Sequence, residues 1–201
     1  LFKDFLYDEE YCIYIGIPFC PSRCLYCSFT SYPIAQYVDK VEDYLQALYK
    51  EMEFVAGADA YKNKRLVAIY IGGGTPSSLT AEDLDRLLTK IKNTLDFTYV
   101  KEFTVEAGRA DSITKEKLQV LYKHGVSRIS VNPQTMKEET LRSIGRAATA
   151  AQTVEAYKLA RECGFDNINM DIILGLPGEN EADVQATIDK ICELAPDSLT
   201  V

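Results

Sequence analysis

The sequence contains no tryptophan and only one histidine, His124. It also has no apolar run long enough to cross a lipid bilayer. Basic residues are outnumbered, because 22 Lys and Arg stand against 30 Asp and Glu and give a formal net charge of −8. Nucleic-acid binding requires a basic surface, so no nucleic-acid partner is expected. His124 precedes Gly125 at an expected helix end, where contact with the last helix carbonyls explains it without a catalytic role.

The bulk composition predicts an ordinary globular domain. The chain has 201 residues, of which 47% are hydrophobic and 26% are charged, and this length fits one core-bearing domain over residues 1–201. Residues 1–10 are expected to form an entry segment. The chain starts at Leu1, and Val201 falls inside an expected strand, so we expect a fragment of a longer chain. No signal-peptide or membrane-spanning pattern is present, which leads us to expect a cytoplasmic location and no membrane partner, and oligomeric state is left open.

Cysteine is the residue type whose placement is most informative. Cys20, Cys24 and Cys27 have the spacing C-x3-C-x2-C and follow an apolar segment, in a loop expected to run from Pro18 to about Pro33. We call residues 18–33 the cysteine loop. Its prolines restrict its path, so three thiolates can converge on one metal centre. Structural zinc sites and standard iron–sulfur clusters use four ligands, so a set of three indicates a centre with one open position.

The other cysteines are expected to have structural roles. Cys12, Cys163 and Cys192 are predicted to be small core residues. Six cysteines, three of them in a metal-like group, also favour a reducing compartment.

Strand-like and helix-like segments alternate along the whole chain, which predicts an α/β fold with a parallel sheet. Strands are expected at Cys12–Ile17, Leu66–Ile71, Glu102–Ala107, Arg128–Asn132, Asn167–Leu174 and Ser198–Val201. Helices are expected at Val38–Val55, from Thr80 to about Leu95, at Thr114–Lys123, Ala150–Cys163 and Glu181–Leu194, with short helical turns from Lys137. A doubly wound sheet and a full or partial barrel both fit this alternation. Unusual residues follow strand after strand at the carboxyl end, which favours a barrel with its site on that rim.

These rim residues have chemistry suited to ligand binding. Gly72-Gly73-Gly74-Thr75 lets backbone amides approach a ligand closely. Glu106 ends an apolar strand, where a buried carboxylate needs a partner; a surface position bonded to Arg109 is the simpler alternative. Gln134 offers both a donor and an acceptor, Arg146 can grip a carboxylate with two bonds, and Asp171 lies among apolar neighbours.

The cysteine spacing, with Tyr26 directly before the last cysteine, resembles the radical S-adenosylmethionine enzymes. The longer string YIGIPFCPSRCLYCSF is similar to their oxygen-independent coproporphyrinogen III oxidase branch, and most similar to its coproporphyrinogen dehydrogenase (HemZ) type. The resemblance implies a partial (βα)6 TIM-like barrel, truncated here near the sixth strand. It also implies a 4Fe–4S cluster on Cys20, Cys24 and Cys27, whose fourth iron binds S-adenosylmethionine.

The resemblance further implies which residues contact the cofactor. Gly73, Gly74 and Thr75 match the motif whose backbone holds the methionine amino group, and Glu106 matches a contact to the ribose or methionine part. Gln134 matches a ribose contact and Arg146 a contact to the methionine carboxylate. The remaining implied cofactor contacts are Tyr14, Tyr26 and Asp171.

For activity, the resemblance implies reductive cleavage of S-adenosylmethionine and decarboxylation of coproporphyrinogen III propionates to vinyl groups in haem synthesis. Arg23 and Arg109 are candidates to pair with those propionates. The implied partners are a porphyrinogen or haem-like molecule and a reductant such as flavodoxin or ferredoxin. Two alternatives stay open: a haem-binding chaperone, and a radical methyltransferase. Ala147-Ala148 and Phe29 depart from the branch pattern, which usually has a basic residue or histidine after Arg146 and in some members a further cysteine at position 29.

Overall fold

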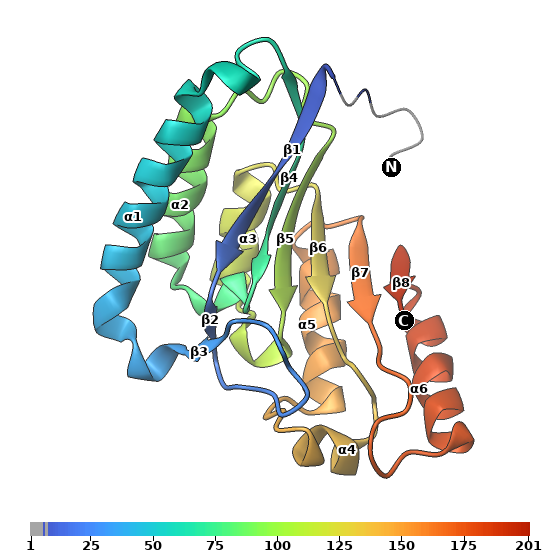
Figure 1. Cartoon of the computed structure of the whole chain (residues 1–201). Coiled ribbons are helices and arrows are strands. Elements are labelled where there is room, and N and C mark those ends of the chain that lie inside the picture. The colour runs from blue at the N-terminus through green and yellow to red at the C-terminus, as the bar shows by residue number, and fades with distance from the viewer. Residues whose placement is uncertain (1–5, 7) are drawn as a thin grey trace.

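The computed structural model describes residue 6 and residues 8–201, and its centre is a six-stranded parallel sheet. The strands are β1 (Glu10–Ile17), β4 (Arg65–Gly73), β5 (Glu102–Gly108), β6 (Arg128–Val131), β7 (Ile168–Asp171) and β8 (Ser198–Thr200). They pair in that order, so each strand lies beside the next one along the chain. A second, two-stranded sheet pairs β2 (Phe19–Cys20) with β3 (Tyr32–Pro33), inside the cysteine loop. Figure 1 shows that β4, β5, β6 and β7 point toward the end of the molecule that carries this loop.

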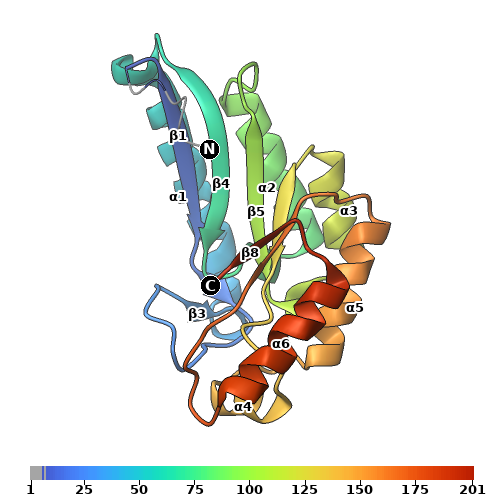
Figure 2. The same cartoon turned by 90° about the vertical axis from the view of Figure 1, so that its right-hand side faces the viewer.

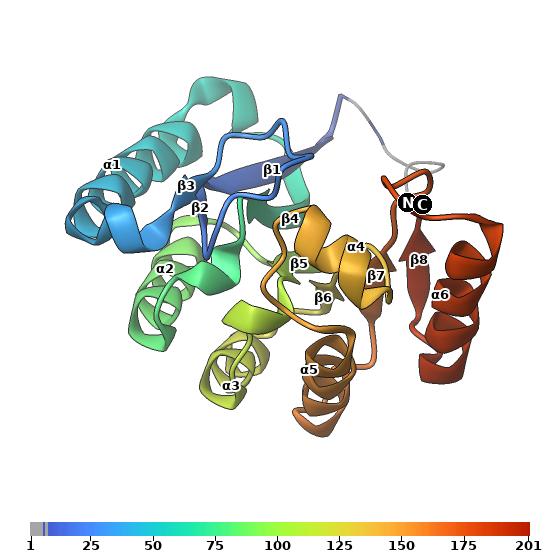
Figure 3. The ribbon, with the colours of Figure 1, turned by 90° about the horizontal axis from the view of Figure 1, so that it is seen from below.

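Helices connect successive strands of the large sheet. They are α1 (Val38–Gly57), α2 (Ala81–Thr94), α3 (Lys115–Lys123), α4 (Glu138–Ser143), α5 (Ala150–Glu162) and α6 (Glu181–Leu194). Seen along the strands, the sheet forms an arc with α1, α2, α3, α5 and α6 along its outer side (Figure 3). From the β8 side, α6 and β8 lie nearest the viewer, at the opposite end of the arc from α1 and β1 (Figure 2). A doubly wound sheet reverses strand order and carries helices on both faces, so this structure is a partial barrel.

The hydrophobic core lies between the sheet and these outer helices. Ile69 and Ile71 of β4 are almost fully buried, as are Leu87 and Leu88 of α2. Alternate residues of each strand point to the other face, which is concave and polar: Tyr70 and Glu106 bond to one another there. The sheet therefore has an apolar outer face that stabilises the fold and a polar inner face that leads to the carboxyl-end rim.

The predicted elements are confirmed with small shifts of their ends. Thr80 caps α2 by accepting from the Asp83 amide, and α6 has the predicted bounds. The fifth strand is shorter than predicted, because after Asp171 the chain leaves the ladder and makes only an isolated bridge from Ile172 to Gln134. The pairing of β2 with β3 was not predicted. Of the expected entry segment, residues 1–5 and 7 lie outside the described residues.

Two predictions about single residue types are wrong. Cys12 and Cys192 are exposed and not in the core, whereas Cys163 is partly buried and packs against it. Cys12 shares the concave face with Tyr14, two positions along β1, so the same alternation that buries Ile15 exposes it. His124 does end α3, but its ring bonds to Asp85 at 2.8 Å rather than to helix carbonyls.

Within residues 6 and 8–201, no helix has the length and hydrophobicity that a membrane span requires.

Candidate cluster and cofactor site

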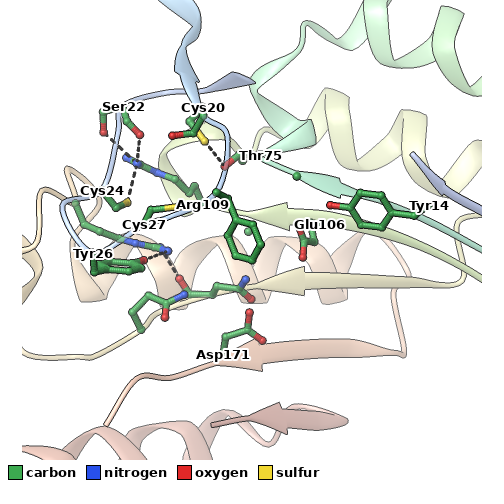
Figure 4. A pocket seen from close by; sticks show the side chains of 18 residues that line it. Tyr14, Cys20, Ser22, Cys24, Tyr26, Cys27, Thr75, Glu106, Arg109 and Asp171 are labelled. Carbon is green, nitrogen blue, oxygen red and sulfur yellow. Dashed lines mark hydrogen bonds between the residues drawn. The ribbon is translucent and has the colours of Figure 1, made fainter. Parts of the chain in front are cut away.

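A pocket opens at the carboxyl ends of the strands, beneath the cysteine loop (Figure 4). Every residue predicted from the sequence to bind metal or cofactor lines this one pocket. They are Tyr14, Cys20, Cys24, Tyr26, Cys27, Gly73, Gly74, Thr75, Glu106, Gln134, Arg146 and Asp171. The sheet topology explains this convergence, since parallel strands bring all their carboxyl ends to one edge.

The three clustered cysteines face the pocket as free thiols. Cys20 and Cys24 are buried and Cys27 is partly exposed. The Cys20 Sγ lies 3.5 Å from the Thr75 hydroxyl, and the Cys24 Sγ accepts from Arg109 Nη1 at 3.5 Å. In the part of the chain that the structure describes, no three Cys, His, Asp or Glu side chains surround a single ion position. An iron–sulfur cluster does not require that arrangement, because each thiolate binds a different iron.

The cysteine loop is held in place from four directions. The Phe19 carbonyl accepts from the Thr75 amide at 2.7 Å, just after β4. The Leu25 amide donates to the Ile144 carbonyl at 2.9 Å, just after α4. The two remaining ties are side-chain bonds, from Arg109 to Ser22 and from Arg146 to the Tyr26 hydroxyl at 3.1 Å. The position of the thiols is therefore set by groups that lie at the ends of several strands and helices.

The glycine run after β4 is required by this close packing. Gly73 has φ of +108°, a conformation that favours glycine. A Cβ on Gly74 would lie 2.6 Å from the Phe19 carbonyl oxygen and 3.0 Å from the Cys20 Sγ. The backbone of the run therefore forms one wall of the pocket directly against the first cysteine.

Glu106 and Tyr70 form a bonded pair on the concave face. The Tyr70 hydroxyl donates to Glu106 Oε1 at 2.5 Å, and burial raises the pKa of the Glu106 carboxyl although this bond opposes the shift. Burial also raises the pKa of Tyr70, and the hydrogen bond to the Glu106 carboxylate raises it further. The alternative in which Glu106 sits at the surface bonded to Arg109 is wrong. Glu106 is a partly buried acceptor that points into the pocket (Figure 4).

The wall opposite the cysteine loop is formed by the ends of β6 and β7. Burial raises the pKa of Asp171, while hydrogen bonds from Thr200 and Asn169 lower it, and the Asn169 amide approaches Asp171 Oδ1 to 2.6 Å. Gln134 has φ of +65°, which is uncommon for a residue with a side chain. Its amide donates to the Asp171 carbonyl and its carbonyl accepts from Ile173. A strained backbone conformation of this kind at a pocket is typical of functional residues.

Two polar atoms at this wall are buried without a partner. Arg146 Nη1 donates to the Asn132 carbonyl at 2.7 Å, but Arg146 Nε has no hydrogen-bond acceptor. Asn132 Oδ1 likewise has no donor, and Asn132 also lines the pocket. Because buried polar groups are normally paired, one unpaired donor and one unpaired acceptor indicate a ligand with complementary groups.

Sequence reasoning missed Asn132 and Tyr70. Asn132 directly follows a strand, like the residues that were predicted. Tyr70 lies two positions before Gly72, on the same face of β4. Both positions were readable in principle from strand alternation.

Of the two arginines predicted to pair with propionates, Arg109 does not suit that role, and the role of Arg23 stays a prediction. Arg109 is 3% exposed, and its guanidinium is occupied by Asp111, Ser22 and Cys24. Arg23 is exposed and lies outside the pocket lining. Neither side chain therefore presents a free cation to this pocket.

The donor set fits a 4Fe–4S cluster with S-adenosylmethionine. Three thiols leave one iron open, and Arg146 Nε offers a donor for a carboxylate. Asn132 Oδ1, Glu106 and Asp171 offer acceptors for amino and hydroxyl groups.

Comparison with known proteins agrees with this geometry. The family model described as the radical SAM superfamily matches residues 14–191. The chain belongs to the radical SAM superfamily. Membership implies a 4Fe–4S cluster and S-adenosylmethionine as the cofactors.

Within the radical SAM superfamily, the chain groups with the HemN, HemZ and HemW proteins. It is 45% identical over 194 residues to the oxygen-independent coproporphyrinogen-III oxidase-like protein HemZ of Bacillus subtilis, covering 96% of this chain and 39% of that protein. It is 37% identical over 181 residues to the haem chaperone HemW of Lactococcus lactis, covering 90% of this chain and 45% of that protein. The solved structure of coproporphyrinogen III oxidase (HemN) from Escherichia coli superposes with a TM-score of 0.80 at 26% identity, covering 96% of this chain and 45% of that one. The chain thus spans about two fifths to one half of the length of these relatives.

Proposed function

We propose that this chain is the radical SAM core of an enzyme that oxidatively decarboxylates coproporphyrinogen III, the reaction class of the oxidase branch. One observation carries the proposal. The three cysteines line a single pocket together with the predicted polar residues, which lie on or just after five different strands. When bound, the cluster and S-adenosylmethionine would supply the one-electron chemistry that removes a hydrogen atom from substrate.

The residues of this chain would then bind the cluster and S-adenosylmethionine and orient them. Cys20, Cys24 and Cys27 would ligate three irons. Arg146 would pair with the methionine carboxylate, and the backbone of Gly73 and Gly74, with Thr75, would hold its amino group. Glu106, Gln134 and Asp171 would fix the ribose and amino groups, and Tyr14 and Tyr26 would flank them.

The substrate and partners form part of the same proposal. Similarity to HemZ and HemN supports a porphyrinogen, which is an anionic macrocycle. The electron would come from a low-potential carrier such as flavodoxin or ferredoxin, in a reducing compartment that keeps six cysteines free.

A haem chaperone is the second candidate, because the HemW proteins of Lactococcus lactis and Bacillus subtilis are 37% and 36% identical over at least 90% of this chain. The solved structure of a radical S-adenosylmethionine methyltransferase matches this chain at only 20% identity. A likeness at that level shows a shared fold alone, so it does not support methyl transfer.

The proposal is tested under anaerobic conditions with the full-length protein and a reconstituted cluster. Dithionite and S-adenosylmethionine should yield 5′-deoxyadenosine, and Cys20→Ser, Cys24→Ser or Cys27→Ser should abolish it. Cys192→Ser, an exposed thiol of α6 outside the pocket, is the matched control and should keep the wild-type yield. Protein that binds zinc instead of an iron–sulfur cluster would refute the assignment.

A second assay separates the two candidates. Conversion of coproporphyrinogen III to a product that has lost two carboxyl groups supports the oxidase. Stoichiometric haem binding without conversion supports the chaperone.

A further inference from the structure

Arg109 links the end of β5 to the cysteine loop through a buried charge. Its Nη1 donates to the Ser22 carbonyl at 2.9 Å, to the Ser22 hydroxyl at 3.0 Å and to the Cys24 Sγ at 3.5 Å. These contacts join residues 85 and 87 positions apart in the sequence. Figure 4 shows the guanidinium directed at Ser22 and Cys24, on the loop side of the pocket.

The fold fixes this guanidinium in one orientation. Asp111 grips its other edge with two bonds, from Nε to Oδ1 at 2.9 Å and from Nη2 to Oδ2 at 2.6 Å. Gly108 has φ of +48°, and the Arg109 amide donates back to the Ala107 carbonyl at 2.6 Å, so a tight turn aims the side chain beneath the loop. Arg109 is 3% exposed, so water competes little for its N–H groups.

A second donor reaches the first cysteine from the neighbouring strand. The Thr75 hydroxyl lies 3.5 Å from the Cys20 Sγ, and the amide of the same residue holds the Phe19 carbonyl. Two of the three clustered thiols therefore meet a hydrogen-bond partner supplied by a strand end. Only the partner of Cys24 carries a positive charge.

From this arrangement we propose that Arg109, oriented by Asp111, is a positioning residue that sets the reduction potential of the iron–sulfur cluster. The inference rests on the proposed cluster at Cys20, Cys24 and Cys27. One-electron reduction adds a negative charge that spreads onto the ligand sulfurs. An N–H donor and a buried cation at the Cys24 sulfur stabilise that reduced form and raise the potential. Asp111 makes this rise in potential smaller, because its carboxylate compensates the positive charge of Arg109.

The test is a potentiometric titration of the full-length protein with its reconstituted cluster, with the reduced cluster measured by electron paramagnetic resonance. Arg109→Gln should shift the midpoint to a more negative potential, and Arg109→Lys should shift it less. Asp111→Asn should shift it in the opposite direction, because the arginine charge is then uncompensated. Arg86→Gln, which removes an arginine that pairs with Glu42 and Asp83 on the surface, is the control and should leave the midpoint unchanged. A tenfold change in the ratio of oxidised to reduced cluster corresponds to 59 mV for one electron.

Opposite shifts in the Arg109 and Asp111 variants are the result that supports the proposal. A purely structural role predicts less cluster in all three variants but the wild-type midpoint in whatever cluster remains, and that result, or variants that retain no cluster at all, would overturn it. Failure of the wild-type protein to take up a 4Fe–4S cluster would refute the proposed function, and this inference with it. An unchanged midpoint in loaded variants would refute the inference alone.

Discussion

The Tyr70 hydroxyl donates a 2.5 Å hydrogen bond to Glu106 across two neighbouring strands. The two residues are 36 positions apart in the sequence, yet both lie on the concave face of the sheet. Replacing Tyr70 by Phe should therefore reduce the free energy of unfolding by about 1–2 kcal/mol, because a partly buried carboxylate loses its donor. In a double-mutant cycle with Glu106→Ala, which removes the acceptor, the coupling energy measured by urea unfolding should be roughly 0.5–3 kcal/mol. Additive effects would show that the bond contributes nothing to stability.

The pH dependence of stability should change when Glu106 loses its charge. Burial raises the pKa of Glu106 above its ordinary value of 4.5, so the folded protein holds this proton more tightly than the unfolded chain does. The carboxyl thus contributes stability below pH 4.5, and this contribution is lost as the pH rises through the folded-state pKa. Glu106→Gln should therefore be no more stable than wild type near pH 4 and more stable near pH 7. Urea unfolding at both pH values checks the sign, and a difference that shrinks toward neutral pH would contradict it.

Asn132→Ala should separate stability from binding. Its Oδ1 is buried without a donor, so removing it should leave the free energy of unfolding unchanged or slightly higher. Affinity of the cluster-loaded protein for S-adenosylmethionine should fall about tenfold, which is 1.4 kcal/mol. Equilibrium binding measures the loss, and Asn93→Ala on the exposed face of α2 serves as the control. Equal affinity in the two variants would show that Oδ1 does not meet the ligand.

Gly74→Ala should destabilise the protein by about 1–3 kcal/mol, because its Cβ meets the Phe19 backbone at 2.6 Å. Gly57→Ala is the matched control, since nothing lies within 4 Å of a Cβ at that helix end. Its stability should stay within about 0.5 kcal/mol of wild type. Thermal unfolding of both variants gives the comparison, and similar melting temperatures would refute the close contact.

Local patterns in the sequence predicted the elements, and the resemblance to the radical S-adenosylmethionine enzymes implied most of the pocket. Periodicity located the helices, and polar residues after apolar strands identified Glu106, Gln134 and Asp171. Because all parallel strands end at one edge, placing each residue at a strand end was enough to bring them together.

The pairings inside the pocket were not predictable in the same way. Arg109 was expected to be free for a substrate carboxylate, yet it is occupied by Asp111 two positions on and by Ser22 87 positions away. Long-range partners of this kind depend on how strands are stacked, which sequence spacing does not encode. The unpaired Oδ1 of Asn132 is visible only when every neighbouring donor is in place.

The four-way fastening of the cysteine loop has a consequence for maturation. Its anchors come from the ends of β4, β5 and α4 and from Arg146, so the thiols acquire their positions only after these parts of the chain have assembled. If the proposed cluster binds here, we expect its iron to be loaded late, because a nascent or misassembled chain would present three thiols that do not yet face one position.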